Sequence, residues 1–303
     1  MDGIIIVDKP KGYTSHDVVN VVKKTLNTSK VGHTGTLDPN ATGVLPVLVG
    51  KATKISKYLI EHDKTYIAEL ALGEKSSTGD IEGEIIERKE VPNVTEEQIK
   101  EVLQKFLGKQ MQTPPIYSSI KINGKKAYEY ARSGQTIEIP AREIEIMEIS
   151  LSNFEDNIIT FKVSCSKGTY IRTLCHDIGQ KLGCGACMEK LTRTKVSRFE
   201  IKDSLTLAQI EVLKKEDRLS EILIPIDQMF ANYPSIIVSG EAARLAYNGN
   251  GIKDRDVRKD ENILDEAYVR VYDDVEDFIG VYQYHEKERE YRIRKMFYIK
   301  EEK

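Results

Sequence analysis

The chain has 303 residues, with 45 Lys and Arg against 48 Asp and Glu, and a formal net charge of −3. Its length is enough to bury a sizeable core and favours more than one domain. No apolar run approaches the ~18 residues of a transmembrane helix, and residues 1–8 lack the basic start and long apolar run of a signal peptide. We therefore expect a cytoplasmic protein with no membrane contact.

Positive charge is unevenly distributed along the chain. Residues 1–70 carry nine Lys and Arg against seven Asp and Glu, and residues 100–200 carry sixteen against eleven. The segments 71–99 and 201–303 are acidic. Because local fields decide where a polyanion binds, this distribution is compatible with a polyanionic partner. Lys-rich faces are nevertheless more often plain solvated surface.

The first elements are a short strand and a helix. Residues 3–7 are an apolar β-type run that ends at the turn Lys9-Pro-Lys-Gly12. Ser15 is a good N-cap residue for a helix that continues to about Leu26. Its apolar residues Val18, Val22 and Leu26 recur on one helical face.

Residues 30–43 form a glycine-rich segment, Lys-Val-Gly-His-Thr-Gly-Thr-Leu-Asp-Pro-Asn-Ala-Thr-Gly, that fits neither a helical nor a strand period. Apolar runs flank it, and a polar loop between buried elements often carries chemistry. Its acid, Asp38, is the candidate reactive group, with His33 five residues earlier. An Asp before a Pro is also a common turn former, so the residues alone leave a structural role open. The glycine spacings of nucleotide-binding loops are absent.

The middle of the chain alternates strands and helices. Residues 44–49 and 64–72 are predicted strands, and Tyr66 lies on the apolar face of the second, where aromatics usually pack into the core. Residues 73–90, rich in Gly and Glu, are expected to be a hairpin or loop. Thr95-Glu-Glu-Gln98 is a capping box that opens an amphipathic helix.

A basic and aromatic cluster follows a predicted hairpin turn at Asn123-Gly124. This cluster fits both an amphipathic helix with a solvated face and a contact with an RNA backbone, and the residues do not decide between them. Its members are Lys125, Lys126, Tyr128, Tyr130 and Arg132. Residues 137–149 and 157–166 alternate like paired strands, and residues 173–182 read as a helix ended by Gly183.

The last third of the chain changes character. A short helix is expected over 204–213, and residues 220–234, which contain two prolines, make a plausible domain boundary. From Ile236 the chain reads as a strand, a helix capped by Ser239 and several short strands. Cys184 and Cys187 have the C-x-x-C form, but two further ligands at zinc spacing are missing, so we expect no metal site.

Residues 33–46, His-Thr-Gly-Thr-Leu-Asp-Pro-Asn-Ala-Thr-Gly-Val-Leu-Pro, resemble the catalytic motif of the bacterial tRNA pseudouridine-55 synthases. The similarity covers roughly the first two thirds of the chain and weakens after about residue 230. Further matches follow in order: Val7-Asp-Lys-Pro-Lys-Gly12 with Thr14-Ser15, Lys64-Thr-Tyr66, and Ser166-Lys-Gly-Thr-Tyr-Ile-Arg-Thr173.

The resemblance implies an α+β fold, the pseudouridine synthase fold, with a mainly antiparallel mixed sheet flanked by helices. It also implies a small β-rich C-terminal domain of the RNA-binding PUA type. This assignment depends on position and size, and not on a PUA sequence signature. We accordingly divide the chain into a catalytic domain, residues 1–230, and an accessory domain, residues 235–303.

The resemblance also implies roles for single residues. Asp38 matches the essential nucleophile, Arg172 matches the Arg that pairs with it, and Tyr66 matches the Tyr that stacks on the target base. Aromatic stacking suits a uracil that has left its stack. Arg172 is expected to keep the Asp38 carboxyl ionised, because a nearby opposite charge lowers a carboxyl pKa.

Four further residues are expected to bind the substrate. His33 is suited to fill by stacking the gap left by a flipped uridine, and Leu191 matches an apolar residue of the pocket. Lys9 belongs to a loop that the resemblance places beside the active centre, and Asp80 aligns with an acid that the family keeps near its Arg. A lone His is otherwise usually structural.

The implied reaction breaks the bond from ribose C1′ to uracil N1 and rejoins the base through C5. Nothing is oxidised and no group is added, so we expect no cofactor and no metal. The expected partner is tRNA, bound through its T-arm stem-loop, and the chain is predicted to be a monomer. The residues do not say whether Asp38 attacks ribose C1′ or uracil C6, or whether a ribose C2′ proton leaves first.

Two other classes of protein are alternatives to the synthase. A non-catalytic RNA-binding module or tRNA-folding chaperone on the same scaffold is disfavoured, because Asp38, Tyr66 and Arg172 are all present. A glycoside hydrolase shares the attack of a carboxylate on a sugar C1′, but it normally needs a second carboxyl as acid or base. No such partner stands in these motifs.

Overall fold

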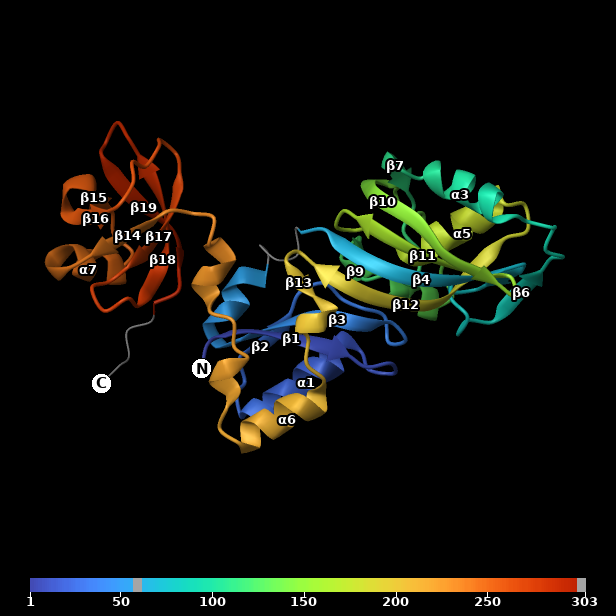
Figure 1. Cartoon of the computed structure of the whole chain (residues 1–303), viewed down its shortest axis with the longest axis horizontal. Helices are drawn as coiled ribbons and strands as arrows, with labels where there is room; N and C mark the ends of the chain where they lie inside the picture. The colour runs from blue at the N-terminus through green and yellow to red at the C-terminus, as the bar shows by residue number, and fades with distance from the viewer. Residues whose placement is uncertain (57–61, 299–303) are drawn as a thin grey trace.

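The structure is a computed structural model that describes residues 1–56 and 62–298. Figure 1 shows a long sheet that occupies the centre and one end of the molecule, and a small β-rich domain at the other end. The small domain, drawn in orange and red, is formed by the last part of the chain. These two bodies agree with the expected α+β architecture.

The large sheet is mainly antiparallel, as expected. Within the described part of the chain only the short contact between its strands β3 and β12 runs parallel. In spatial order its strands are β1 (Gly3–Lys9), β3 (Thr42–Val49), β12 (Ala186–Val196), β4 (Lys64–Leu72), β11 (Ile158–Cys165), β10 (Arg142–Glu155) and β7 (Gly108–Gln112), with β2 (Val31–His33) beside β3 and β13 (Phe199–Glu200) beside β12.

Helices cover this sheet in two groups. One group packs on β1 and β3 through a core that includes Val18, Val22 and Ile210. The other packs on β4, β10 and β11 through a core that includes Ile99 and Ile178. The first group is α1 (Ser15–Leu26) and α6 (Leu207–Lys215), and the second is α3 (Glu96–Gln104) and α5 (Ile171–Lys181).

Helix starts show how local chemistry sets the boundaries. The capping box at Thr95 is confirmed, because its side chain accepts a hydrogen bond from the Gln98 amide at 3.3 Å. The cap of α1 is Thr14, whose hydroxyl accepts from the Asp17 amide at 3.0 Å, so the expectation of Ser15 was wrong by one residue. The Ser15 hydroxyl instead accepts a hydrogen bond from the Leu37 amide at 2.9 Å, in the glycine-rich loop.

Two small hairpins project from the large sheet. The hairpin turn at Asn123-Gly124 is confirmed, since both residues have positive φ, 51° and 84°. The elements of these regions are β5 (Glu74–Ser76), β6 (Ile85–Arg88), β8 (Lys121–Ile122), β9 (Lys125–Lys126) and α4 (Ala127–Arg132). Short 3-10 helices complete the N-terminal body: η1 (Gly50–Ile55), η2 (Ile201–Asp203), η3 (Leu219–Glu221) and η4 (Ile226–Phe230).

The small domain has the predicted order of a strand, a helix and then short strands. Its core packs α7 (Gly240–Tyr247) against the sheet through Ala243, Ala246 and Tyr282. In spatial order the strands are β15 (Ile252–Lys253), β19 (Glu290–Met296), β18 (Phe278–His285), β17 (Tyr268–Tyr272), β14 (Ser235–Val238) and β16 (Val257–Lys259), and η5 (Asp254–Asp256) joins β15 to β16.

Aromatic side chains attach the small domain to the large sheet. Phe230 of η4 lies 6.3 Å from Phe278 and 5.9 Å from Phe297, centroid to centroid. This cluster is continuous with buried Ile4 and Val44 of strands β1 and β3. The small domain is therefore joined to the large sheet by apolar packing in addition to the covalent link.

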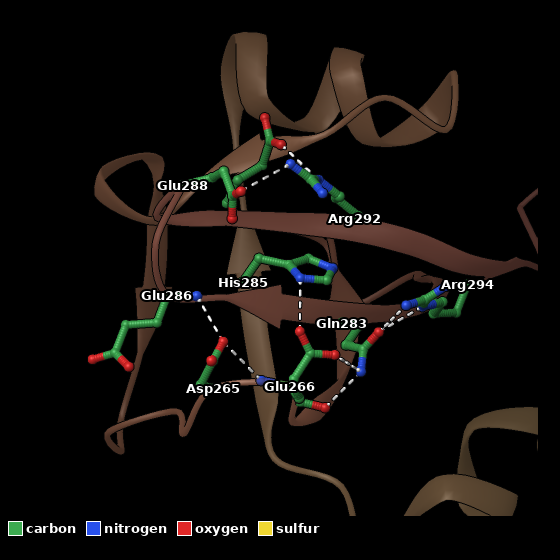
Figure 2. A network of polar contacts seen from close by, with 9 residues as sticks. Asp265, Glu266, Gln283, His285, Glu286, Glu288, Arg292 and Arg294 are labelled. Atoms are coloured by element: carbon green, nitrogen blue, oxygen red, sulfur yellow. Dashed lines mark hydrogen bonds and ion pairs between the residues drawn. The ribbon is translucent and has the colours of Figure 1, made fainter.

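One edge of the small domain carries a network of polar contacts (Figure 2). Glu266 accepts from His285 Nδ1 at 3.0 Å and from Gln283 Nε2 at 2.7 Å. Arg294 donates to the other end of the Gln283 amide, at 2.8 Å from its Nε. Nearby, Arg292 pairs with Glu290 at 3.0 Å. Carboxylates therefore outnumber arginines within this surface.

Candidate active site

The glycine-rich loop joins β2 to β3, and neighbouring segments hold it from several sides. The Thr34 amide donates to Pro46 O at 3.1 Å, and the Gly12 amide donates to Pro39 O at 2.9 Å. Gly35 has a φ of 71°, in the left-handed region that favours glycine. These bonds present Asp38 at a defined place beside the end of the large sheet.

Asp38 lies directly against Arg172, the second residue of α5. Arg172 Nε is 3.0 Å from Asp38 Oδ2, and the exposed fraction is 7% for the Arg side chain and 42% for the Asp side chain. The guanidinium is held from behind, because it also donates to Thr78 O at 3.0 Å and Tyr117 O at 2.8 Å. A buried, rigid cation therefore aims a carboxylate that remains open to a ligand.

Asp80 is the second acid at this centre. Its Oδ2 lies 3.9 Å from Arg172 Nη1, while its Oδ1 accepts from Thr78 Oγ1 at 2.8 Å and from the Glu82 amide at 3.2 Å. Asp80 thus lies beside Arg172, and its bonds shape the turn that supplies the Thr78 carbonyl. Its place beside the Arg matches the alignment made from the sequence.

Two clefts open on either side of the Asp38–Arg172 pair. The larger, of about 470 Å³, has a basic lining that includes Lys64, Arg132, Lys167 and Arg193. The smaller, of about 250 Å³, has an acidic lining that includes Asp80, Glu82 and Glu189. The positive potential of the first cleft attracts an RNA phosphate, and the negative potential of the second repels it. A nucleic acid would therefore place its backbone in the larger cleft.

Tyr66 and Leu191 line the larger cleft from adjacent strands, β4 and β12. In the antiparallel register Leu191 lies opposite Ala68, two residues beyond Tyr66 on the same face. Both side chains belong to the buried core, as the strand pattern predicted for Tyr66, and burial raises the pKa of the Tyr66 phenol. A flat aromatic ring and a branched aliphatic chain next to Asp38 form a slot suited to a planar base.

Comparison with protein families now identifies the chain. The model of the TruB family pseudouridylate synthase N-terminal domain matches residues 23–171, and the model of the tRNA pseudouridylate synthase B C-terminal domain matches residues 172–231. The tRNA pseudouridine synthase B of Clostridium kluyveri is 42% identical over 297 residues, which cover 98% of this chain and 100% of that protein. The chain belongs to the TruB family.

Other relatives agree. The tRNA pseudouridine synthase B of Alkaliphilus oremlandii is 47% identical over 252 residues, 83% of each protein. Among solved structures, a chain of the H/ACA RNP bound to a substrate RNA containing 2′-deoxyuridine superposes with a TM-score of 0.72 and 25% identity. That match covers 99% of this chain and 86% of the other. The TruB-type fold therefore includes the small C-terminal domain.

Lys9 is buried in this TruB site, whereas the sequence predicted that it binds the substrate. Its side chain is fully buried, and its amine donates to Pro10 O at 3.0 Å, Tyr13 O at 2.5 Å and Pro39 O at 2.9 Å. Burial lowers the pKa of Lys9 to about 8. The expectation that Lys9 binds the substrate does not fit, since an amine enclosed by three carbonyls has no donor left for RNA. It holds the loop that follows Asp38.

His33 ends β2, immediately before the loop. Its Nδ1 is buried and has no hydrogen-bond partner within the described residues. Burial, helped by the charges of Arg193 and His16, lowers the pKa of His33 and keeps the imidazole neutral. A neutral ring is suited to stacking. The described linings of the two clefts do not include His33, so its stacking role stays a prediction.

The basic and aromatic cluster, which lies in β9 and α4, reaches the larger cleft. Arg132 lies over the Tyr128 ring at 5.4 Å, and both residues line the cleft. The sequence left a solvated helix and an RNA contact equally open. With these two side chains turned to the cleft, the arrangement favours the RNA contact, while Lys125 remains exposed at the hairpin turn.

Sequence reasoning missed two residues that shape the site. Arg193 of β12 lies within the cleft wall, and Gln112, at the end of β7, exchanges two hydrogen bonds with the Tyr170 backbone, at 2.8 Å and 3.1 Å. The Gln112 side-chain amide bonds to the N–H and the C=O of Tyr170, as the backbone of a neighbouring strand would. It thereby fixes the start of α5, the helix that carries Arg172. Neither residue has a local signal, because an Arg or Gln in an alternating strand reads as solvent-facing.

No helix within residues 1–56 and 62–298 has the length and apolar character needed to cross a membrane.

Proposed function

We propose that this chain converts the uridine at position 55 of the tRNA T-loop into pseudouridine, with Asp38 as the nucleophile. Membership of the TruB family makes the chain a pseudouridine synthase, an isomerase. The observation that carries the assignment of the nucleophile is the contact of Asp38 with Arg172 at 3.0 Å, where the two clefts meet.

The chemistry requires a nucleophile, a place for the detached base and exclusion of water. A carboxylate is a competent nucleophile toward a glycosidic carbon. Because the product has the same atoms as the substrate, electrons and protons balance without an added reactant. Asp38 supplies the attacking oxygen, and Arg172 Nε holds that carboxylate in place while two loop carbonyls fix the guanidinium.

The base must leave its stack to reach Asp38. Flipping costs a few kcal/mol, less for a loop nucleotide than for a duplex one. The uracil then lies between Tyr66 and Leu191, which line the larger cleft on the same side as Asp38. Stacking on an aromatic ring offsets roughly 1–3 kcal/mol of the cost of flipping. His33 fills the gap that the base leaves in the RNA.

The RNA backbone follows the basic cleft. Arg132 and Lys167 line its mouth beside Tyr128, and phosphate contacts of this kind set affinity and its dependence on salt. The acidic lining of the smaller cleft keeps the backbone to one side of Asp38. The names of the family's members indicate tRNA as the RNA that is bound.

In this proposal the chain acts as a cytoplasmic monomer, with residues 1–230 as the catalytic domain. Residues 235–303 form an accessory domain for RNA. In the polar network of that domain the carboxylates outnumber the arginines, so we assign it contacts with RNA shape and no large share of the electrostatic affinity (Figure 2).

Tritium release tests the reaction. An unmodified tRNA transcript with 5-tritiated uridine is incubated with the purified chain, with and without EDTA and with no cofactor added. Pseudouridine formation exchanges the hydrogen on C5, so one equivalent of tritium should be released from the T-loop uridine alone. A T-loop uridine replaced by cytidine is the matched control. No release, or release spread over other positions, would contradict the proposed reaction or its site.

A further inference from the structure

Arg193 is the largest fully buried polar side chain at the catalytic loop, with an exposed fraction of 1%. Its Nε donates to Val44 O at 2.8 Å and its Nη2 donates to Gly35 O at 2.9 Å. It also lies opposite Tyr66 in the antiparallel register of β12 and β4, and both residues line the larger cleft. One guanidinium therefore holds both ends of the loop that carries Asp38, beside the ring that lines the cleft.

The backbone of Arg193 closes the same loop. Arg193 pairs with Gly43 in the short parallel contact between β12 and β3. Gly43 has a φ of 98°, and a Cβ there would lie 2.2 Å from Arg193 O, so only glycine fits. Side chain and backbone together fix the position of the Asp38 loop relative to Tyr66.

The charge of Arg193 has no carboxylate partner within 4 Å in residues 1–56 and 62–298. A guanidinium stays protonated in proteins, and an unpaired buried cation is costly unless something offsets it. Burial is the main cause that lowers the pKa of Lys64, His33 and Lys9, and the charge of Arg193 lowers it further. Arg193 thus maintains a positive potential inside the larger cleft.

The reaction places negative charge where this cation lies. When the C1′–N1 bond breaks, its electron pair leaves with the uracil, and when a nucleophile adds to C6, the electron pair moves to the C5–C4–O4 system. In both routes the base in the cleft becomes an anion before C5 joins C1′ and the C5 proton leaves. A preorganised charge in a water-excluded site stabilises such an intermediate strongly.

We propose that Arg193 is the positioning residue that joins Tyr66 to the Asp38 loop, and that its fixed charge stabilises the uracil anion formed during the isomerisation. The proposal rests on the proposed function, because it names the group that the same site uses for the detached base. Arg172 cannot serve both purposes, since its Nε holds Asp38 and its other nitrogens hold two carbonyls.

The first test separates charge from geometry. Arg193→Lys and Arg193→Met are similar in length and both lose the forked hydrogen bonds, so their difference reports the charge. Single-turnover rates are measured with a T-arm stem-loop that carries uridine or 5-fluorouridine at the target position. With uridine the Met variant should be slower than the Lys variant by up to about 100-fold, as when one oxyanion donor is removed.

The comparison of uridine with 5-fluorouridine distinguishes the charge role of Arg193 from a purely structural one. A structural role would give the same rate gap between the two variants for both bases. Fluorine at C5 stabilises the uracil anion, so the step should depend less on the protein's cation. The gap between the two variants should therefore shrink with 5-fluorouridine, measured as consumption of that nucleoside by mass spectrometry. An equal gap for both bases would overturn the charge role, whereas wild-type protein inactive on uridine would refute the proposed function itself.

A second measurement does not require an Arg193 variant to fold. Full-length Asp38→Asn protein, which retains Arg193, is saturated with the 5-fluorouridine stem-loop, and the fluorine NMR shift is followed against pH. A nearby cation favours the ionised base, so the pKa of its N3–H should fall by about one unit relative to the free stem-loop. An unchanged or raised pKa in the complex would contradict the proposal.

Discussion

Two polar clusters in this molecule use charge in opposite ways. In the small domain the network of Figure 2 pairs cations with carboxylates, as Arg292 does with Glu290 at 3.0 Å. Beside the catalytic loop, the cations Lys9 and Arg193 bond to backbone carbonyls instead, and Arg172 bonds to two carbonyls in addition to Asp38.

The difference lies in the net charge that each surface keeps. A carbonyl satisfies the hydrogen-bond donors of a cation without cancelling its unit charge, so the cleft retains a positive field. In the small domain Arg292 is offset by its carboxylate neighbours Glu288 and Glu290, and exposed pairs of this kind stabilise the fold by roughly 0–1 kcal/mol. The comparison indicates that the cleft, and not the tail, supplies the attraction for RNA.

The largest effect within this comparison is expected from Arg172. Arg172→Lys keeps a positive charge but loses the planar fork that holds Asp38, Thr78 O and Tyr117 O together. A misaimed group can cost ~100-fold in rate, so single turnover should fall by about that factor while tRNA affinity changes little. Arg132→Lys, at the cleft mouth, is the matched control and should alter affinity without that loss of rate.

A smaller effect is expected from Lys9. Lys9→Met removes the amine donor from three carbonyls, of which Pro39 O keeps the Gly12 amide. The loss costs about 1–3 kcal/mol of unfolding free energy, and it loosens the loop after Asp38. Turnover should fall less than for Arg172→Lys. The exposed neighbour Lys11, changed to Met, should alter neither rate nor melting temperature. Equal effects at the two lysines would show that the carbonyl contacts are unimportant.

The same variant has a pH signature. The pKa of Lys9 is lowered from 10.5 to about 8 in the folded chain. Between these values the unfolded chain binds more protons, so the free energy of unfolding gains a positive slope with pH. Lys9→Met lacks this contribution, and its melting temperature should rise less, or fall more, than that of the wild type from pH 8 to pH 10. Parallel curves would contradict the assigned burial of charge.

The smallest effect is expected in the small domain. Glu266→Gln keeps the shape of the Figure 2 network but removes the carboxylate that His285 Nδ1 meets at 3.0 Å. Turnover and tRNA affinity should stay within about twofold, and stability should change by less than about 1 kcal/mol. A marked loss of tRNA affinity would show that this charged edge participates in binding.

Much of the fold could be predicted from local pattern. The strand at 64–72, the capping box at Thr95 and the hairpin at Asn123-Gly124 depend on neighbouring residues, and the structure confirms them. Strand β10 begins at Arg142, so the strand predicted from residue 137 was too early by five residues. Such boundaries depend on pairing with β7, which no local pattern encodes.

The site was less accessible to sequence reasoning than the fold. The Asp38 loop was recognisable because its residues are contiguous and resemble a family motif. Arg193 was not, because its partners Gly35 and Val44 are brought to it only when β12 pairs with β3. Lys9 was assigned to the substrate because a lysine in a loop is normally exposed, whereas tertiary packing encloses this one.

One measurement tests the central claim that Asp38 is the nucleophile. Asp38→Asn keeps size and hydrogen-bonding capacity but removes the reactive carboxylate, and single-turnover rate, tRNA affinity and melting temperature are compared with those of the wild type. The account predicts no detectable turnover, nearly unchanged affinity because phosphate contacts dominate binding, and a similar melting temperature. Turnover within about tenfold of the wild type, which corresponds to a rise of at most ~1.4 kcal/mol in barrier height, would contradict it.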